Sequence, residues 1–176
     1  PIARGSVPET WTTTNINSGW SANTINNGAM AATIGGGGWF ENRHGVPVQR
    51  ENIVNDDGGT VSGGIDNTAG NAGASSTDAT FATVGGGRLN TASGDSATVG
   101  GGYGNTASGG GATIPGGSAN TASGLYAFAA GYNANAAHNG AFVWADSQLP
   151  SYASSAADQF RVRAQGGVIL DTGSAF

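Results

Sequence analysis

The sequence predicts an all-β protein, a parallel β-solenoid built from coils of about 15 residues. Three observations favour this fold. A 15-residue pattern recurs in register along the middle of the chain. Each repeat contains two short β-like segments, ATVGG and NTAS, that are followed by Gly or another turn-forming residue. Finally, 33 of the 176 residues are Gly and only 28 are Ile, Val, Leu or Phe, too few for the core of an ordinary globular domain.

The repeat is clearest when the chain is aligned on its recurring Ala residues. Ala82, Ala97, Ala112 and Ala127 open the segments ATVGGGRLNTASGDS, ATVGGGYGNTASGGG, ATIPGGSANTASGLY and AFAAGYNANAAHNG. An Asn also recurs eight residues into each repeat, at Asn67, Asn90, Asn105, Asn120 and Asn135. A biased composition alone would not make several positions recur together every 15 residues. The pattern therefore predicts near-identical coils that stack on one another.

The same pattern continues upstream, to Gly59 and Ala32, if two insertions are allowed. Ala32 and Gly59 are 27 residues apart, and Gly59 and Ala82 are 23 apart, so each interval exceeds one repeat. The excess residues place the insertions at about 38–49 and 71–78. We therefore divide the chain into an N-terminal cap with a degenerate first coil (1–31), the β-roll repeats (32–146) and a C-terminal capping segment (147–176).

Strand alternation predicts which side chains fill a coil. Ala97 and Val99 should point to one face and Thr98 to the other, which gives a narrow interior of Ala, Val and Ile. After each NTAS segment the chain has to turn, and a residue that tolerates positive φ suits that point. The expected turn positions are Gly94, Gly109, Gly124 and Asn139.

A single thin roll is expected to need partners. Its small core gains only ~25 cal/mol per Å² of buried apolar surface, against roughly 1–2 kcal/mol of backbone entropy per residue. Three chains packed side by side would share a larger core. We expect an apolar rank to face the common axis of such a homotrimer: Val84, Val99, Ile114, Ala129 and Val143.

The 14- or 15-residue repeats rich in Gly, Ala and Asn resemble the YadA-like heads of trimeric autotransporter adhesins. The resemblance covers about residues 59–146, with a weaker extension back to about residue 20. The segments GAFVWADS and DQFRVRAQGGV are similar to those that close such arrays in bacterial surface proteins and phage-type tail fibres. The resemblance implies a left-handed parallel β-roll, a homotrimer, and a location on the bacterial cell surface or a phage-like particle.

The first insertion, GWFENRHGVPVQ, is the least repeat-like stretch of the chain. It holds the candidate ligand-binding residues Trp39, Phe40, Arg43 and His44. Aromatic and Arg side chains supply much of the free energy at binding interfaces. We expect either a loop that covers neighbouring coils or a contact site for a glycan or protein receptor. The second insertion consists of small and polar residues, which is typical of a flexible surface loop.

After Asp146 the period stops. In the segment FRVRAQGGVIL, Phe160 and Val162 alternate with Arg161 and Arg163. This alternation predicts a half-buried strand with its apolar residues inside. We expect the segment to cap the open end of the solenoid, which otherwise exposes unpaired backbone.

The charged residues argue against several functions. All six basic residues are Arg and the net charge is −5, which leaves no basic patch for nucleic acid. Without Cys, and with His44 and His138 far apart in the repeats, we expect neither a metal site nor a cofactor. Asp56, Asp57 and Asp66 are better explained as turn residues than as a Ca²⁺ cluster, because calcium-binding repeats carry an Asp in every turn. The apolar runs are too short for membrane insertion.

The favoured function is a non-enzymatic extracellular fibre segment, structural or adhesive, that presents loops to a surface or receptor. The alternative is a self-assembling filament or spacer subunit without its own ligand. An ice-binding solenoid is less favoured, because Thr83, Thr98 and Thr113 form a ladder with one Thr per strand and not two. A glycan-active β-helix would need paired carboxylates, and the later regular coils hold only Asp95 and Asp146.

Overall fold

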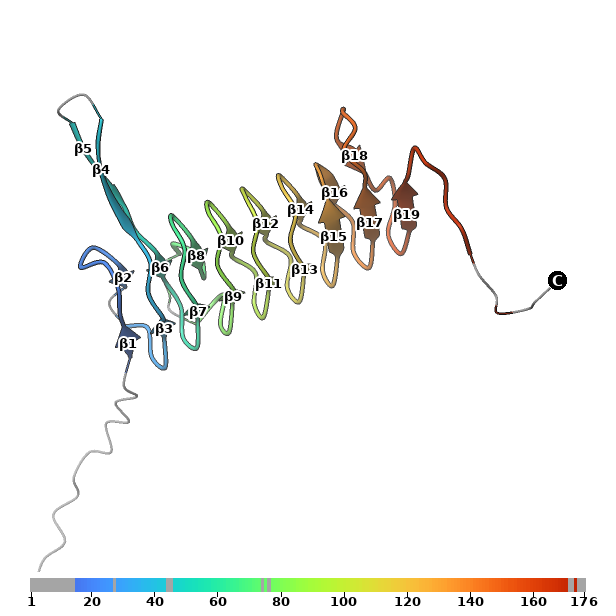
Figure 1. The fold of residues 1–176 in the computed structure, drawn as a ribbon. Coiled ribbons are helices and arrows are strands. Elements are labelled where there is room, and N and C mark those ends of the chain that lie inside the picture. Colours follow the sequence, from blue (N-terminus) through green and yellow to red (C-terminus); the bar gives the residue numbers. More distant parts are fainter. Residues whose placement is uncertain are drawn as a thin grey trace, which may run out of the picture.

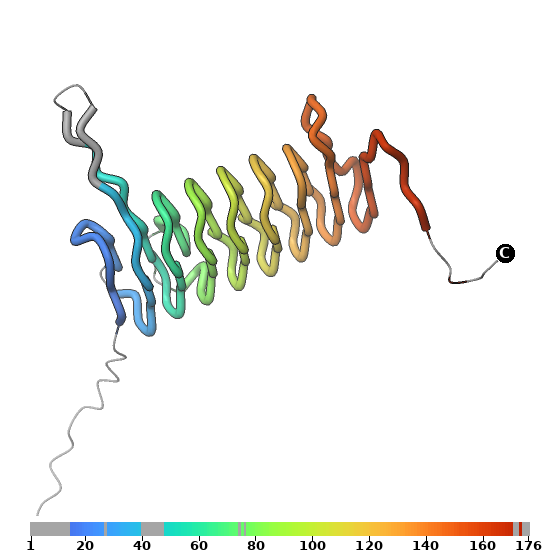
Figure 2. The backbone as a smooth tube through the Cα atoms, viewed as in Figure 1, coloured from blue at the N-terminus to red at the C-terminus, as the bar shows by residue number. Residues whose placement is uncertain are grey.

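The computed structural model describes residues 15–26, 28–43, 46–73, 75, 77–170 and 173. It is the all-β parallel solenoid that the repeats predict, with successive coils stacked along one axis (Figure 1). The backbone tube in Figure 2 passes through the coils as a flattened spiral. This part of the chain contains no helix, and therefore no helix of the length and apolar character needed to cross a membrane.

Each coil contributes one short strand to each of two sheets. The nine-stranded sheet, called sheet A, comprises β1 (Ile16–Asn17), β3 (Thr33–Ile34), β7 (Thr60–Val61), β9 (Thr83–Val84), β11 (Thr98–Val99), β13 (Thr113–Ile114), β15 (Phe128–Gly131), β17 (Phe142–Ala145) and β19 (Phe160–Arg163). The eight-stranded sheet B comprises β2 (Thr24–Ile25), β6 (Ile53–Val54), β8 (Thr68–Ala69), β10 (Thr91–Ala92), β12 (Thr106–Ala107), β14 (Thr121–Ala122), β16 (Ala134–Ala136) and β18 (Tyr152–Ala153). A separate antiparallel pair consists of β4 (Trp39–Arg43) and β5 (Val46–Arg50).

Neighbouring coils pair in parallel and in register. Thr98 lies opposite Thr83 on one side and Thr113 on the other. In sheet B, Thr106 lies between Thr91 and Thr121. The 15-residue spacing thus becomes a ladder of equivalent residues, one per coil, at the ~4.8 Å separation of paired strands.

Small apolar side chains from both sheets fill the interior. Ala97 and Val99 of sheet A and Ala107 of sheet B have no exposed surface. The rank expected at a subunit axis is also fully buried inside the single chain: Val84, Val99, Ile114, Ala129 and Val143. These five residues belong to the core of one chain, and a contact between chains would have to use other residues.

A ladder of buried Asn side chains runs through the core beside the Gly-rich turns. Its members are Asn23, Asn52, Asn67, Asn90, Asn105 and Asn120. The Oδ1 atom of Asn105 accepts a hydrogen bond from the backbone N–H of Asn120 at 3.0 Å. Its Nδ2 atom donates to the carbonyls of Gly101 in its own coil and Gly117 in the next, at 2.9 and 3.0 Å. One side chain therefore satisfies buried polar groups in two coils.

The 14-residue step after Ala127 ends this ladder. The backbone N–H of Ala134 donates to Oδ1 of Asn120 at 2.9 Å, so Ala134 occupies the next inner position. Asn135 lies opposite Thr121 on the outward rank. The expected equivalence of Asn135 with the earlier Asn residues is wrong, because a shift of one residue moves a side chain to the other face of a strand.

The glycines after the NTAS segments are required by close contact between coils. Gly94, Gly109 and Gly124 do not have a positive φ, so that expectation is wrong. A Cβ on Gly109 would lie 1.9 Å from the carbonyl oxygen of Gly124, and one on Gly124 would lie 2.1 Å from that of His138. The residue equivalent to Gly124 in the next coil is therefore His138 and not Asn139.

The solenoid continues beyond Asp146. Strands β18 and β19 pair in parallel with β16 and β17, so residues 147–163 add a further coil with a longer connection. The strand expected here is confirmed as β19, but its faces are reversed. Phe160 is 72% exposed, whereas Arg161 and Arg163 continue inner ranks of the preceding coil.

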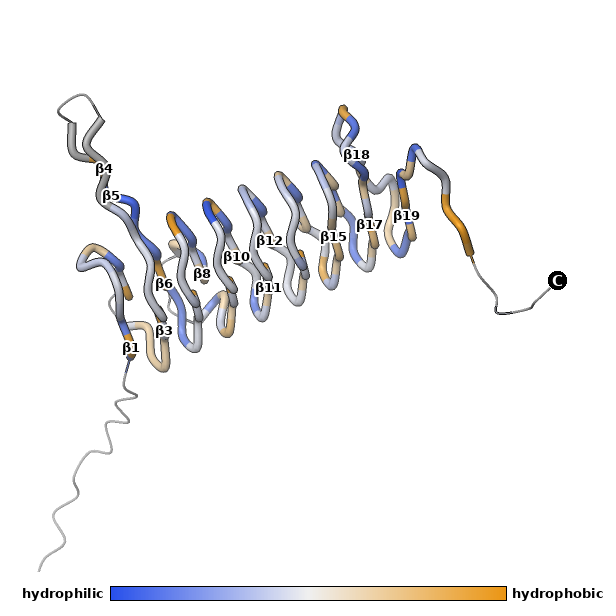
Figure 3. Tube along the Cα trace, in the orientation of Figure 1, coloured by the Kyte–Doolittle hydropathy of each residue, from blue (hydrophilic) through white to orange (hydrophobic). Residues whose placement is uncertain are grey.

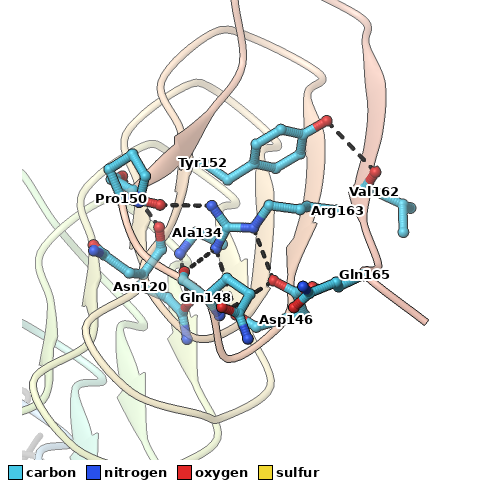
Figure 4. Close-up of polar contacts among 11 residues, drawn as sticks. Asn120, Ala134, Asp146, Gln148, Pro150, Tyr152, Val162, Arg163 and Gln165 are labelled. Atoms are coloured by element: carbon cyan, nitrogen blue, oxygen red, sulfur yellow. Dashed lines mark hydrogen bonds and ion pairs between the residues drawn. The ribbon is translucent and has the colours of Figure 1, made fainter. Parts of the chain in front are cut away.

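Arg163 binds the connection that precedes β18 (Figure 4). Its Nε donates to Oδ1 of Asp146 at 2.8 Å, and an Nη atom donates to the carbonyl of Pro150. The guanidinium lies 5.2 Å from the ring centroid of Tyr152. The backbone N–H of Gln165, followed by the Arg163 side chain, lowers the pKa of Asp146. An inward Arg is tolerated here because these carbonyl and carboxylate groups satisfy it.

The outward rank of sheet A changes character along the rod. Its members are Ile16, Thr33, Thr60, Thr83, Thr98, Thr113, Phe128, Phe142 and Phe160. The ring centroids of Phe128 and Phe142, and those of Phe142 and Phe160, are 4.6 Å apart, and the rings are stacked. Figure 3 shows a further hydrophobic stretch after β19, where residues 168–170 are exposed.

Substitution of Asn105 by Ala should lower the free energy of unfolding by about 2–4 kcal/mol. The change would leave the Asn120 N–H and the Gly101 and Gly117 carbonyls buried without this partner. Thr106→Ala, on the outward side of the neighbouring strand, is the control and should change stability by less than about 0.5 kcal/mol. Urea unfolding followed by circular dichroism measures both. Equal stability of the two variants would contradict a structural role for the ladder.

Gly109→Ala and Gly116→Ala separate steric contact from backbone conformation, because neither residue has a positive φ. A Cβ on Gly109 would meet the carbonyl of the next coil, whereas a Cβ on Gly116 has nothing within 4 Å. We expect Gly109→Ala to lower the free energy of unfolding by about 1–3 kcal/mol and Gly116→Ala to leave it nearly unchanged. Equal losses would show that coil spacing is not the cause.

Candidate functional site: the β4–β5 hairpin

The first insertion forms an antiparallel hairpin and not an irregular loop. Strands β4 and β5 pair Trp39 with Arg50 and Arg43 with Val46. Figure 1 shows this two-stranded sheet set apart from the stacked coils. The insertion is therefore an ordered element that is added to one coil of the solenoid.

Three of the four candidate ligand-binding residues, Trp39, Phe40 and Arg43, lie on β4. His44 lies outside the described residues. All three lie on one strand, with Trp39 at its start and Arg43 at its end. Trp39 is 57% exposed. The hairpin thus carries these three candidate residues on one ordered strand, and the side chain of Trp39 is open to contact.

An ion pair joins the base of the hairpin to the following coil. The Nη1 atom of Arg50 lies 3.0 Å from Oδ2 of Asp66, and both side chains are largely shielded from solvent. Arg50 also lies directly opposite Trp39. The sequence does not predict this ion pair, because the contact between Arg50 and Asp66 depends on how the insertion folds back on the coil.

Gly38 fixes the point at which the hairpin leaves the coil. Its φ is +81°, and a Cβ there would lie 2.6 Å from Oδ1 of Asn23 and 2.6 Å from Cβ of Trp20. Only a residue without a side chain fits this approach. The hairpin consequently departs beside the first Asn of the buried ladder.

The residue types on β4 suit contact with a ligand. An exposed indole offers apolar and ring-stacking surface, and a guanidinium recognises carboxylate or phosphate groups through a planar set of donors. Within the described ranges, no group of three or more His, Cys, Asp or Glu side chains is placed to hold a metal ion.

No family model, curated protein or solved structure matches this chain.

Proposed function

We propose that this chain is a non-enzymatic segment of an extracellular fibre, a stiff rod that presents the β4–β5 hairpin to a surface or receptor. The observation that carries the proposal is the stack of coils, in which backbone ladders link each coil to the next and buried Asn side chains reinforce the coils up to Asn120. Such a body resists local opening at every step. The resemblance to adhesin heads and tail fibres supports a place on a bacterial surface or phage-like particle.

We also propose that three left-handed rolls pack side by side, as the resemblance implies. The inner Val and Ile rank has no surface left to share, so another apolar face is needed. The outward stack of Phe128, Phe142 and Phe160 supplies one, and Trp144 is 37% exposed on the same face of sheet A. The rings are already aligned by the coil register, so an interface there would require little further ordering.

Light scattering on a sizing column should give a native mass near three times the 17.2 kDa of one chain. Phe142→Asp, which places a charge in the middle of the aromatic stack, should yield a folded monomer with an unchanged circular dichroism spectrum. A wild-type monomer would contradict the trimer. Filaments seen by electron microscopy would favour the self-assembling alternative. That alternative is the second candidate because Phe160 is exposed on β19, the last strand of sheet A.

Combined replacement of Trp39 and Arg43 by Ala should weaken ligand binding by at least roughly tenfold without loss of the fold. Binding is measured on a glycan array and on whole bacterial or host cells. The matched control replaces Arg88 and Tyr103, an exposed Arg and aromatic pair with a 6.0 Å cation–π contact elsewhere on the solenoid. Loss of binding in the control alone would contradict a contact site on the hairpin.

A further inference from the structure

Asp56 occupies a position that holds Gly in the later regular coils. The same turn hydrogen bond identifies this position, because its carbonyl accepts from the N–H three residues on: Asp56 from Gly59, Gly94 from Ala97 and Gly109 from Ala112. Asp56 has no exposed surface. Burying an ionised carboxylate costs several kcal/mol of free energy, on the order of the stability of the whole domain, unless a partner compensates it.

The carboxylate of Asp56 faces the second insertion, which begins one coil further on. Its Oδ2 atom accepts a hydrogen bond from the backbone N–H of Asn71 at 2.7 Å. Its Oδ1 atom is buried and has no hydrogen-bond donor. Asp78, at the end of the insertion, lies close enough to raise the pKa of Asp56. An ionised carboxylate has no proton to donate, so Asp78 cannot satisfy this oxygen.

No basic side chain compensates the two carboxylates within the described part of the chain. The ion pairs there join Arg50 to Asp66 and Arg163 to Asp146. Burial first, and then the nearby charges of Asp78 and Asp57, raise the pKa of Asp56, whereas the Asn71 N–H lowers it. Such a pair is accommodated by a shared proton or by a bound cation.

Two further oxygen atoms lie close together beside Asn71, whose N–H binds Asp56. A Cβ on Gly73 would lie 2.5 Å from both Oδ1 of Asn71 and Oδ2 of Asp78. Oδ1 of Asn71 accepts one hydrogen bond, from the Gly73 N–H at 2.6 Å, and has a second lone pair. Gly70 has a φ of +88°, and its backbone lies against the Asp56 carboxylate. A Cβ on Gly70 would be 2.5 Å from Oδ2 of Asp56. Carboxylate and amide oxygens are the ligands that Ca²⁺ prefers in proteins.

The geometry points to a Ca²⁺ site formed by Asp56 and Asp78, with Asn71 as a third oxygen donor and water completing the shell. The cation supplies the partner that Oδ1 of Asp56 lacks and fixes the second insertion on the solenoid. Three protein ligands make a weak site, with a Kd of about 10⁻⁴–10⁻³ M, as in extracellular modules. Asp57 and Asp66 are not part of it, because they bind the Met30 N–H and Arg50.

Thermal unfolding with CaCl₂ or with EDTA tests the site on the whole chain. About 10 mM Ca²⁺ at neutral pH should raise the Tm by about 3–6 °C. Asp56→Asn and Asp78→Asn should each abolish this shift. Asp78 is exposed, so its variant tests the site without disturbing the core. Asp158→Asn removes an exposed charge at a distant corner and should keep the full shift.

A shared proton is the outcome that would overturn the proposal. Because folding raises the pKa of Asp56, protonation stabilises the folded state, and the Tm in EDTA should rise as the pH is lowered. If this rise occurs but Ca²⁺ gives no shift at neutral pH, the pair holds a proton and not a cation. An equal shift with NaCl of matched ionic strength, or in both Asn variants, would show general screening and would also exclude the site.

Discussion

Hydrogen bonding by the buried Asn side chains is the constraint on which the rest of the structure depends. The Gly-rich turns direct carbonyl groups into the coil, and the amide of Asn90 satisfies those of Gly86 and Gly102. A Cβ on Gly87 would lie 2.2 Å from the Gly102 oxygen and 2.8 Å from Nδ2 of Asn90. The GGG turn and the Asn that follows it therefore require each other, and the small residues of the repeat reflect how closely the coils approach.

The stacking of coils and the strand register follow from the sequence, because a strict 15-residue period leaves one parallel arrangement for equivalent strands. The inward direction of the Asn side chains does not follow from the sequence. Asn is usually exposed, and periodicity alone does not separate inside from outside at a turn. Asn135 illustrates this limit, since the loss of one residue moves it outward while Ala134 takes the inner position. Gly109 shows the same limit, since its place in a turn suggests a need for positive φ, whereas the structure requires Gly there for close packing between coils.

The two ends of the solenoid and its insertions were harder to predict. Rules taken from the middle coils assume that another coil follows, and beyond β19 the described chain has none. Inward Arg163 is stable there because carbonyls and Asp146 satisfy it, a solution that apolar alternation does not suggest. The first insertion is expected to be a loop, whereas it forms a hairpin, and the pairing of Arg50 with Asp66 depends on how that hairpin folds back on the next coil. The candidate sites lie where the repeat is interrupted.

Equivalence of the central coils also makes the length of the molecule adjustable. If residues 97–111 were removed, Asn90 would lie next to Asn120 and Val84 next to Ile114, and every remaining contact would be of a kind already present. Each coil gained or lost changes the distance between the hairpin and the aromatic stack by ~4.8 Å. Recombination between near-identical repeats can therefore alter the reach of the hairpin in uniform steps while leaving the hairpin itself unchanged.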